Sequence, residues 1–216
     1  MRLVLFDVDG TLVDSQAHIV ASMETAFAAL GLVPPSRKDT LSIVGLSLPR
    51  AMEALAPLAP KAELVEAYKE AYQSLRGRHG EAAASPLYPG IRSMLEALHA
   101  EPETLLGVAT GKSRKGLDHV METHGLAGFF ITRQDADGHP SKPHPSMALA
   151  ALTDAGLESG VMVGDTTFDL EMGRAAGMAT IAVTWGYHDA ERLAPLADRV
   201  VHDTASLEAA IDEVCP

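Results

Sequence analysis

The sequence predicts an α/β fold in which a doubly wound parallel sheet carries a small inserted helical domain. Two observations lead to this prediction. After residue 90, short apolar runs of strand length alternate with longer stretches whose apolar residues recur at helical spacing. Before residue 90, one strand-like run is followed by a long segment of helical periodicity. Repeated β-α units of this kind form a parallel sheet with helices on both faces, a Rossmann-like core.

The first element is the apolar run Leu3–Phe6, which predicts a strand and leads directly into Asp7 and Asp9. Because side chains alternate along a strand, the two carboxylates point to one side while Val8 points into the fold. Two like charges this close raise each other's pKa unless a cation lies between them. The Asp9-Gly10 dipeptide is also typical of a β-hairpin turn, so the motif alone fits a turn as well as a functional site.

The next segment, residues 15–85, predicts a compact helical insert. Apolar residues recur at helical spacing over residues 19–30 and 64–75, and each stretch ends near a glycine. Several prolines between them exclude long strands, and residues 80–86 predict a looser connection. The predicted division is an α/β core of residues 1–14 and 86–216, with the insert between them.

The remaining elements follow in alternation. The strands are predicted at residues 104–109, 129–132, 160–163, 179–183 and 199–201. The helices are predicted at residues 91–98, 113–124, 145–155, 168–176, 190–196 and 206–214. Ligands of such sheets bind at the carboxyl ends of the strands, so residues that directly follow strands are the candidates for function.

Composition narrows the classes of function. The chain has 216 residues and a formal net charge of −12, which disfavours nucleic acid and anionic membrane surfaces as partners. Cys215 is the only cysteine, so no disulfide can form within the chain and we expect a cytoplasmic protein. The nine histidines include no H-x-x-x-H pair, which leaves zinc without sequence support. The sequence does not indicate an oligomeric state.

Polar residues follow several of the predicted strands. Thr110 and Gly111 follow the strand at 104–109, and Asp165 follows the strand at 160–163. Lys142 lies in a loop before a helix, and Asp169 follows Asp165 by four residues. Acidic and hydroxyl groups collected with one lysine at one edge of a sheet suit Mg²⁺ and a phosphoryl group.

Each of these residues also has an ordinary structural explanation. Thr110 could end its strand or cap the following helix, and Lys142 could be an exposed loop lysine. Asp165 and Asp169 could be helix-start residues that the helix dipole favours. These separate explanations do not account for the repetition of such features at successive strand ends.

The chain resembles the haloacid dehalogenase superfamily, in particular its phosphoglycolate phosphatase-like members with a small helical cap. The resemblance rests on Asp7-Val-Asp-Gly-Thr11, the strand that ends in Thr110, the Lys142-Pro pair and the Gly164-Asp motif that extends to Asp169, in this order along nearly the whole chain. It implies an Mg²⁺-dependent phosphatase that hydrolyses a small phosphorylated metabolite, similar to phosphoglycolate, through an aspartyl-phosphate.

The resemblance also implies roles for the residues. Asp7 would be the nucleophile and Asp9 the general acid and base, with Asp7, Asp9 and Asp165 holding the metal. The phosphoryl group would be bound by Thr110, Gly111 and Lys142, and Asp169 would position Lys142 or a metal-bound water. In the insert, the loop Val44–Arg50 is a candidate for substrate contact, with Arg50 near an anionic leaving group; an exposed surface arginine fits equally well.

Related activities remain as alternatives. A phosphomutase similar to β-phosphoglucomutase would share the core residues, but those mutases carry Arg-x-Asp-Ser-Leu where this chain has Pro49-Arg-Ala-Met-Glu53. A pyrophosphatase would also fit the core. Dehalogenases lack the second aspartate of the first motif and phosphonatases replace it with a small residue, so Asp9 disfavours both.

Two other classes of protein share parts of this pattern. The stretch Gly107–Ser113 is similar to a nucleotide-binding P-loop, but it has three residues between its glycines where the motif needs four. A non-enzymatic phospho-acceptor domain also combines acidic residues with a threonine and a lysine on a parallel sheet. Such domains are much shorter and carry no inserted cap.

Overall fold

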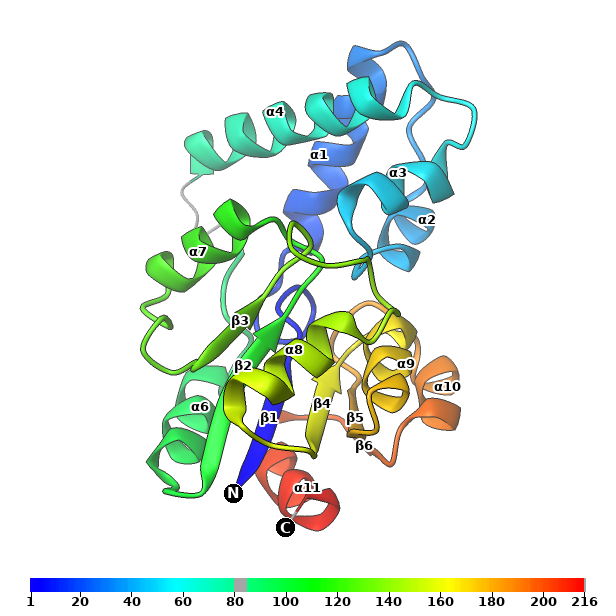
Figure 1. Ribbon diagram of the computed structural model, residues 1–216. Helices are drawn as coiled ribbons and strands as arrows, with labels where there is room; N and C mark the ends of the chain where they lie inside the picture. The colour runs from blue at the N-terminus through cyan, green and yellow to red at the C-terminus, as the bar shows by residue number, and fades with distance from the viewer. Residues whose placement is uncertain (80–84, 216) are drawn as a thin grey trace.

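A central parallel sheet organises the chain, as the computed structural model shows for residues 1–79 and 85–215 (Figure 1). Within these residues the sheet has six strands in the order β3-β2-β1-β4-β5-β6, and every neighbouring pair is parallel. The strands are β1 (Arg2–Phe6), β2 (Thr104–Ala109), β3 (Thr132–Gln134), β4 (Gly160–Gly164), β5 (Ala179–Val183) and β6 (Arg199–Val201). The first strand of the chain therefore lies in the middle of the sheet, between β2 and β4.

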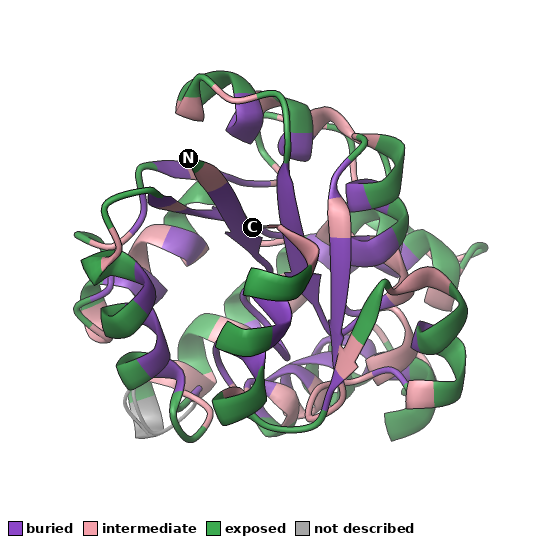
Figure 2. Cartoon of the chain, turned by 90° about the horizontal axis from the view of Figure 1, so that it is seen from below, coloured by how far each residue is buried: buried purple, intermediate pink, exposed green. Residues whose placement is uncertain are grey.

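Helices pack on both faces of this sheet, which confirms the doubly wound fold. They are α6 (Ile91–Ala100), α7 (Arg114–Thr123), α8 (Ser146–Ala155), α9 (Thr167–Ala175), α10 (Ala190–Leu193) and α11 (Leu207–Val214). Alternate residues of β1 serve opposite faces: Val4 and Phe6 join the core beneath α6, α7 and α11, whereas Leu3 and Leu5 join the core beneath α8 and α9. Figure 2 shows the buried strands enclosed by helices whose outer sides are exposed.

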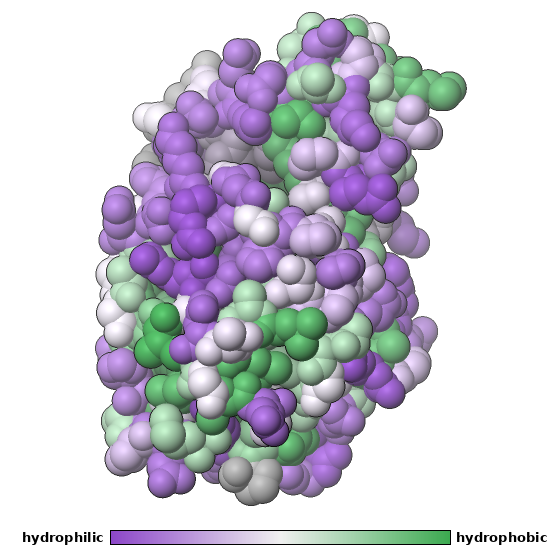
Figure 3. All heavy atoms as spheres, viewed as in Figure 1, coloured by the Kyte–Doolittle hydropathy of each residue, from purple (hydrophilic) through white to green (hydrophobic). Residues whose placement is uncertain are grey.

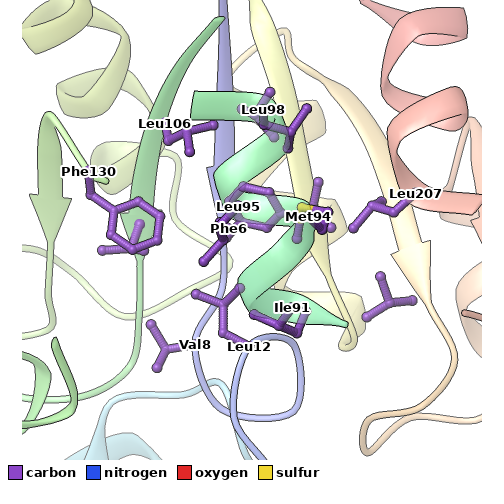
Figure 4. Packing of buried hydrophobic residues seen from close by; sticks show 14 of the residues in the cluster. Phe6, Val8, Leu12, Ile91, Met94, Leu95, Leu98, Leu106, Phe130 and Leu207 are labelled. Carbon is purple, nitrogen blue, oxygen red and sulfur yellow. The ribbon is translucent and has the colours of Figure 1, made fainter. Parts of the chain in front are cut away.

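The contact between α6 and the sheet is the clearest part of the larger core. Ile91, Met94, Leu95 and Leu98 recur at helical spacing on α6, and all four are buried. Figure 4 shows them together with Phe6 of β1 and Leu106 of β2. The apolar stripe that predicted this helix is therefore the surface that it buries.

Among the residues that the structure describes, four helices lie between β1 and α6 in the sequence, and we call them the helical insert. They are α1 (Gln16–Ala29), α2 (Arg37–Ser42), α3 (Leu48–Leu55) and α4 (Lys61–His79). Met23, Phe27, Met52 and Leu64 form a hydrophobic cluster of their own within the insert. Figure 1 shows these helices together beyond one end of the sheet. The exact boundaries at residues 14/15 and 85/86 stay a prediction, and most of the connection predicted at 80–86 lies outside the described residues.

The two ends of the insert are hydrogen-bonded to each other. Val13 and Leu87 form an isolated antiparallel bridge. On either side of it, the Asp14 N–H donates to the Pro86 carbonyl at 2.8 Å and the Tyr88 N–H donates to the Leu12 carbonyl at 3.0 Å. The chain therefore leaves the sheet and returns to it at the same point.

Most predicted elements agree with the structure, but the strand predicted at 129–132 was misplaced. The strand β3 is Thr132–Gln134, whereas Phe130 precedes it and is buried in the larger core. The aromatic residues at 129–130 pack in the core beneath the sheet, but they lie in the segment before β3 and not in the strand itself. Asp9-Gly10 does begin a turn, in which Gly10 has a positive φ and the Leu12 N–H donates to the Val8 carbonyl. The turn does not join two strands of a hairpin, because β1 has only parallel partners among the described residues.

None of the helices in residues 1–79 and 85–215 has the length and apolar character that crossing a membrane requires.

The difference in burial between leucines predicts how strongly a change to alanine destabilises the protein. Changing the fully buried Leu95 to alanine should lower the free energy of unfolding by about 2–5 kcal/mol, because both transfer energy and a cavity are involved. Leu149 on α8 is 47% exposed and serves as the matched control, so Leu149→Ala should cost much less. Urea titrations of both variants measure this, and equal losses would contradict the assignment of Leu95 to the core.

Candidate active site

The centre of the site is a buried lysine between two carboxylates. The Nζ of Lys142 lies 2.6 Å from Oδ1 of Asp7 and 2.6 Å from Oδ1 of Asp169. All three side chains are essentially inaccessible to solvent. Asp7 follows β1, Lys142 precedes α8, and Asp169 lies in the first turn of α9, so the sheet topology brings together residues that are far apart in the sequence.

This environment changes the proton affinities of the groups. Burial raises the pKa of Asp7 to about 7, with the charges of Asp169 and Asp9 adding to the rise and Lys142 opposing it. Burial alone would lower the pKa of Lys142, but Asp169 and Asp7 together raise it above its ordinary value. Lys142 therefore stays protonated in the site. Its charge does not fully offset the effects of burial and of the neighbouring carboxylates on the pKa of Asp7.

Asp169 has two functions in the structure. Its Oδ2 accepts the Thr166 N–H at 3.0 Å and the Thr166 hydroxyl at 2.6 Å, which forms a capping box at the start of α9. Its Oδ1 contacts Lys142. The helix-start explanation of this residue is confirmed, and its other oxygen contacts Lys142; a role in positioning Lys142 stays a prediction.

The carboxylate of Asp165 accepts hydrogen bonds from two distant parts of the chain. Its Oδ1 accepts the Thr11 hydroxyl at 2.9 Å, and its Oδ2 accepts the Tyr187 N–H at 2.9 Å. Burial raises its pKa well above the ordinary value, and the charges of Asp7 and Asp169 raise it further. Gly10 has a φ of +91°, and a β-carbon there would collide with the Asp165 carboxylate. Only glycine therefore lets this turn pass so close to Asp165.

The acidic residues form a donor set that fits a hard cation. One carboxylate oxygen each from Asp7, Asp165 and Asp169 lie within 4.8 Å of one another. The Oδ2 atom of Asp7 is buried and has no hydrogen-bond partner among the described residues. Three carboxylates beside one ammonium leave a local excess of negative charge, and all the donors are oxygens. Mg²⁺ fits these residues in both charge and ligand type.

Asp9 has different partners from Asp7. Its Oδ1 lies 2.9 Å from Nζ of Lys112 and accepts the Ser15 hydroxyl at 2.5 Å. Burial alone would lower the pKa of Lys112, but the adjacent Asp9 carboxylate raises it above the ordinary value. The two aspartates of the first motif therefore have separate ammonium partners, Lys142 for Asp7 and Lys112 for Asp9.

A cavity of about 500 Å³ lies between the catalytic edge of the sheet and the helical insert. Asp7, Asp9, Thr110 and Gly111 line its sheet side. Lys142 does not line the cavity, but it contacts the lining residue Asp7 and, on its other side, Asp169. Residues of α1, α3 and α4 and the loop before α3 line its other side, which is largely apolar. Figure 3 shows hydrophilic side chains gathered over the region between the insert and the sheet.

The insert rests directly on the sheet at Gly111. A β-carbon at this residue would lie 2.6 Å from the Leu46 carbonyl oxygen and 2.7 Å from that of Gly45, so any larger residue would push the insert loop away. Nearby, the Ser47 N–H donates to the Ser141 hydroxyl at 2.8 Å. Thr110 is buried, and Ser113, rather than Thr110, caps α7.

The structure does not bring Arg50 to the cavity. Residues 44–49 of its loop line the cavity, but Arg50 points its guanidinium to Glu53 at 2.8 Å and is largely exposed. It is the third residue after the N-cap Ser47, and its partner Glu53 lies one turn further along α3. The ordinary surface arginine that the sequence equally allowed is the arrangement found.

Four further residues contact the carboxylates, although the sequence patterns indicated no role for them: Thr11, Ser15, Lys112 and Tyr187. Lys112 belongs to the stretch similar to a P-loop, and its position after Thr110-Gly111 at a strand end was the available signal. Gly107 lies within β2, which is not where a P-loop has its first glycine. Ser15 and Tyr187 are 172 residues apart, and nothing local in the sequence indicates their contact.

Comparison with known proteins agrees with this geometry. Residues 4–183 match the family described as haloacid dehalogenase-like hydrolase. A protein named "Probable phosphatase IndB" from Dickeya dadantii is 37% identical over 209 residues, covering 94% of this chain and 90% of the relative. A phosphoglycolate phosphatase of Agrobacterium fabrum is 32% identical over 219 residues, covering 98% of this chain and 92% of the relative.

Solved structures show the same fold. A haloacid dehalogenase-like hydrolase of Streptococcus pneumoniae superimposes with a TM-score of 0.85 at 25% identity, covering 97% of this chain and 98% of that one. A predicted phosphoglycolate phosphatase from Haemophilus somnus superimposes with a TM-score of 0.83, also at 25% identity and with 97% of each chain covered. The resemblance predicted from the sequence is confirmed, and the chain belongs to the haloacid dehalogenase-like hydrolase family.

Proposed function

We propose that this protein is an Mg²⁺-dependent phosphatase that hydrolyses a small phosphomonoester through an aspartyl-phosphate on Asp7. The observation that carries the proposal is the position of Asp7. Its carboxylate lines the cavity, contacts the buried Lys142, and has a second oxygen that is buried without a hydrogen-bond partner among the described residues. The names of the relatives and the family match support the same class of reaction.

The reaction divides between Asp7 and Asp9. A carboxylate oxygen of Asp7 attacks phosphorus in line, and the bond between phosphorus and the ester oxygen breaks as the aspartyl-phosphate forms. Asp9 donates its proton to the departing oxygen, which leaves as an alcohol. Asp9 then accepts a proton from water, whose oxygen attacks phosphorus. The bond to Asp7 breaks and inorganic phosphate leaves.

The surrounding residues bind the charge that this transfer moves. Lys142 neutralises negative charge on the phosphoryl oxygens as well as on Asp7. The Thr110 hydroxyl, the Gly111 N–H and the N-terminus of α7 are suited to bind the remaining phosphoryl oxygens. The helical insert covers the site and excludes bulk water, which strengthens each of these electrostatic interactions.

Asp7 and Asp165 would hold Mg²⁺ through their carboxylates, with Asp9 contributing its backbone carbonyl and Asp169 placed beside them. When bound, the ion offsets the repulsion between the carboxylates and the phosphate dianion and polarises the phosphoryl group. We also propose phosphoglycolate as the first substrate to assay, because several relatives carry that name. A cytoplasmic location belongs to the same proposal and rests on the single free cysteine, Cys215.

The nucleophile assignment predicts that Asp7→Asn abolishes turnover while the fold is kept. The amide retains the shape of the side chain but cannot form the phosphoryl ester. The expected loss is at least about 10⁴-fold in kcat on a panel of phosphomonoesters, with an unchanged circular dichroism spectrum. Substantial residual hydrolysis by a folded Asp7→Asn protein would refute the assignment.

The raised pKa of Asp7 predicts a pH-dependent stability in the metal-free protein. Because this pKa lies near 7 in the fold and near its ordinary value in the unfolded chain, the native state takes up a proton and stability falls as pH rises from about 4 to 7. Thermal unfolding in a chelator should show this fall relative to Asp7→Asn, which does not titrate. Adding Mg²⁺ should raise Tm more at pH 8 than at pH 5, and a pH-independent Mg²⁺ effect would count against the site.

The position of Arg50 predicts that its charge is dispensable. Arg50→Gln removes the exposed pair with Glu53 and should leave KM within about twofold for substrates with anionic and neutral leaving groups alike. Steady-state kinetics on the two kinds of substrate test this. A selective rise in KM for anionic leaving groups would restore the substrate-contact role that the sequence allowed.

A further inference from the structure

Two side chains donate hydrogen bonds to one oxygen of Asp9, and neither has a role in the proposed reaction. The ammonium of Lys112 lies 2.9 Å from Oδ1, and the Ser15 hydroxyl donates to the same atom at 2.5 Å. The side chain of Lys112 is only 12% exposed and lies 5.5 Å from the centroid of the Tyr72 ring. Lys112 is therefore held between an element of the insert and the first catalytic motif.

The hydroxyl of Ser15 does not cap the helix that it precedes. Ser15 is the N-cap of α1, where a serine normally accepts a backbone N–H of the first turn, yet its side chain makes no capping bond. The residue is fully buried, and its Oγ lies 2.7 Å from the Tyr187 hydroxyl. Because the single proton of Ser15 is donated to Asp9, Tyr187 must be the donor in that second contact.

These contacts determine which oxygen of Asp9 can carry a proton. An ammonium only donates hydrogen bonds, and Ser15 also donates, so Oδ1 is the acceptor of both. A proton bound to Asp9 must therefore be on Oδ2. Asp9 lines the cavity, so its proton is available to a substrate held beside Asp7.

We propose that Lys112 and Ser15 are positioning residues for Asp9, which fix its Oδ1 so that Oδ2 exchanges the catalytic proton with the ester oxygen and then with water. The inference rests on the proposed phosphatase function. Asp9 acts in both halves of that reaction, so loss of its orientation should slow both. The formation of aspartyl-phosphate should be spared only when the leaving group departs without a proton.

The experiment compares Lys112→Met with the unmodified enzyme on two substrates. The first is an alkyl phosphomonoester that the enzyme hydrolyses, whose alkoxide needs a proton to leave. The second is p-nitrophenyl phosphate, whose nitrophenolate leaves without one. For the alkyl ester, kcat should fall about 100-fold, the scale expected when a reacting group is misplaced.

Rapid mixing separates the two steps for p-nitrophenyl phosphate. In Lys112→Met, a burst of nitrophenolate equal to the enzyme concentration should form within about threefold of the normal rate. The following steady state should be about 100-fold slower, because water attack on the aspartyl-phosphate still needs Asp9. Ser15→Ala should act in the same direction by about tenfold, since Lys112 remains. Equal losses in the burst and the steady state would overturn the proposal.

Lys61→Met is the matched control, because Lys61 is an exposed lysine of the helical insert that pairs with Glu53 and does not line the cavity. It should leave both phases within about threefold of the unmodified enzyme. Lys112→Arg retains a cation and should recover part of the steady-state rate. A loss in Lys61→Met as large as that in Lys112→Met would overturn the positioning role by showing that loss of any lysine charge has the same effect.

A double variant guards against a general effect on folding. In an Asp9→Asn background the oriented carboxylate is already absent, so adding Lys112→Met should lower the steady-state rate on p-nitrophenyl phosphate by less than about threefold. Losses that multiply would overturn the positioning role. Activity in folded Asp7→Asn would instead refute the phosphatase mechanism itself, so the two failures are distinguishable.

Discussion

The buried ammonium of Lys142 is the interaction on which the rest of this site depends. A charged group without solvent access costs several kcal/mol to dehydrate, and here the carboxylates of Asp7 and Asp169 offset that cost at 2.6 Å each. The three residues follow β1, precede α8 and begin α9, so one ion triad joins the segments that surround the central strands. Removing Lys142 would leave the two buried carboxylates of Asp7 and Asp169 without their shared cation. Folding of this edge of the sheet and the chemistry at Asp7 therefore share one constraint.

Much of the fold was predictable because apolar periodicity reflects burial directly. The strands β2 and β5 have the predicted bounds, since each is an apolar run that is covered on both faces. The strand β3 was misplaced because Phe130 is equally apolar and equally buried without being in a strand. Periodicity reports that a side chain is inside the protein, and it does not report which backbone conformation carries it there.

The candidate site was predictable to the extent that parallel strands end at a common edge. That rule placed Asp7, Asp9, Thr110 and Asp165 near one another without knowledge of any contact. It could not assign partners, because Ser15 and Lys112 contact Asp9, and Tyr187 contacts Ser15, only through the course of the chain in three dimensions. For Arg50, the sequence indicated the right loop but could not indicate the direction of the side chain. Residues 44–49 of its loop line the cavity, whereas the side chain of Arg50 is largely exposed and pairs with Glu53.

The paired ends of the helical insert have a consequence for how such a protein can change over time. Val13 and Leu87 are bridged, and the Asp14 N–H and the Tyr88 N–H reach across to the opposite segment. Two chain ends that are already neighbours can be joined by a helical unit of almost any length, or by a short turn, without moving the sheet. The helical insert, which lines one side of the cavity, can thus be replaced as a unit. The residues that perform the chemistry stay in the α/β core.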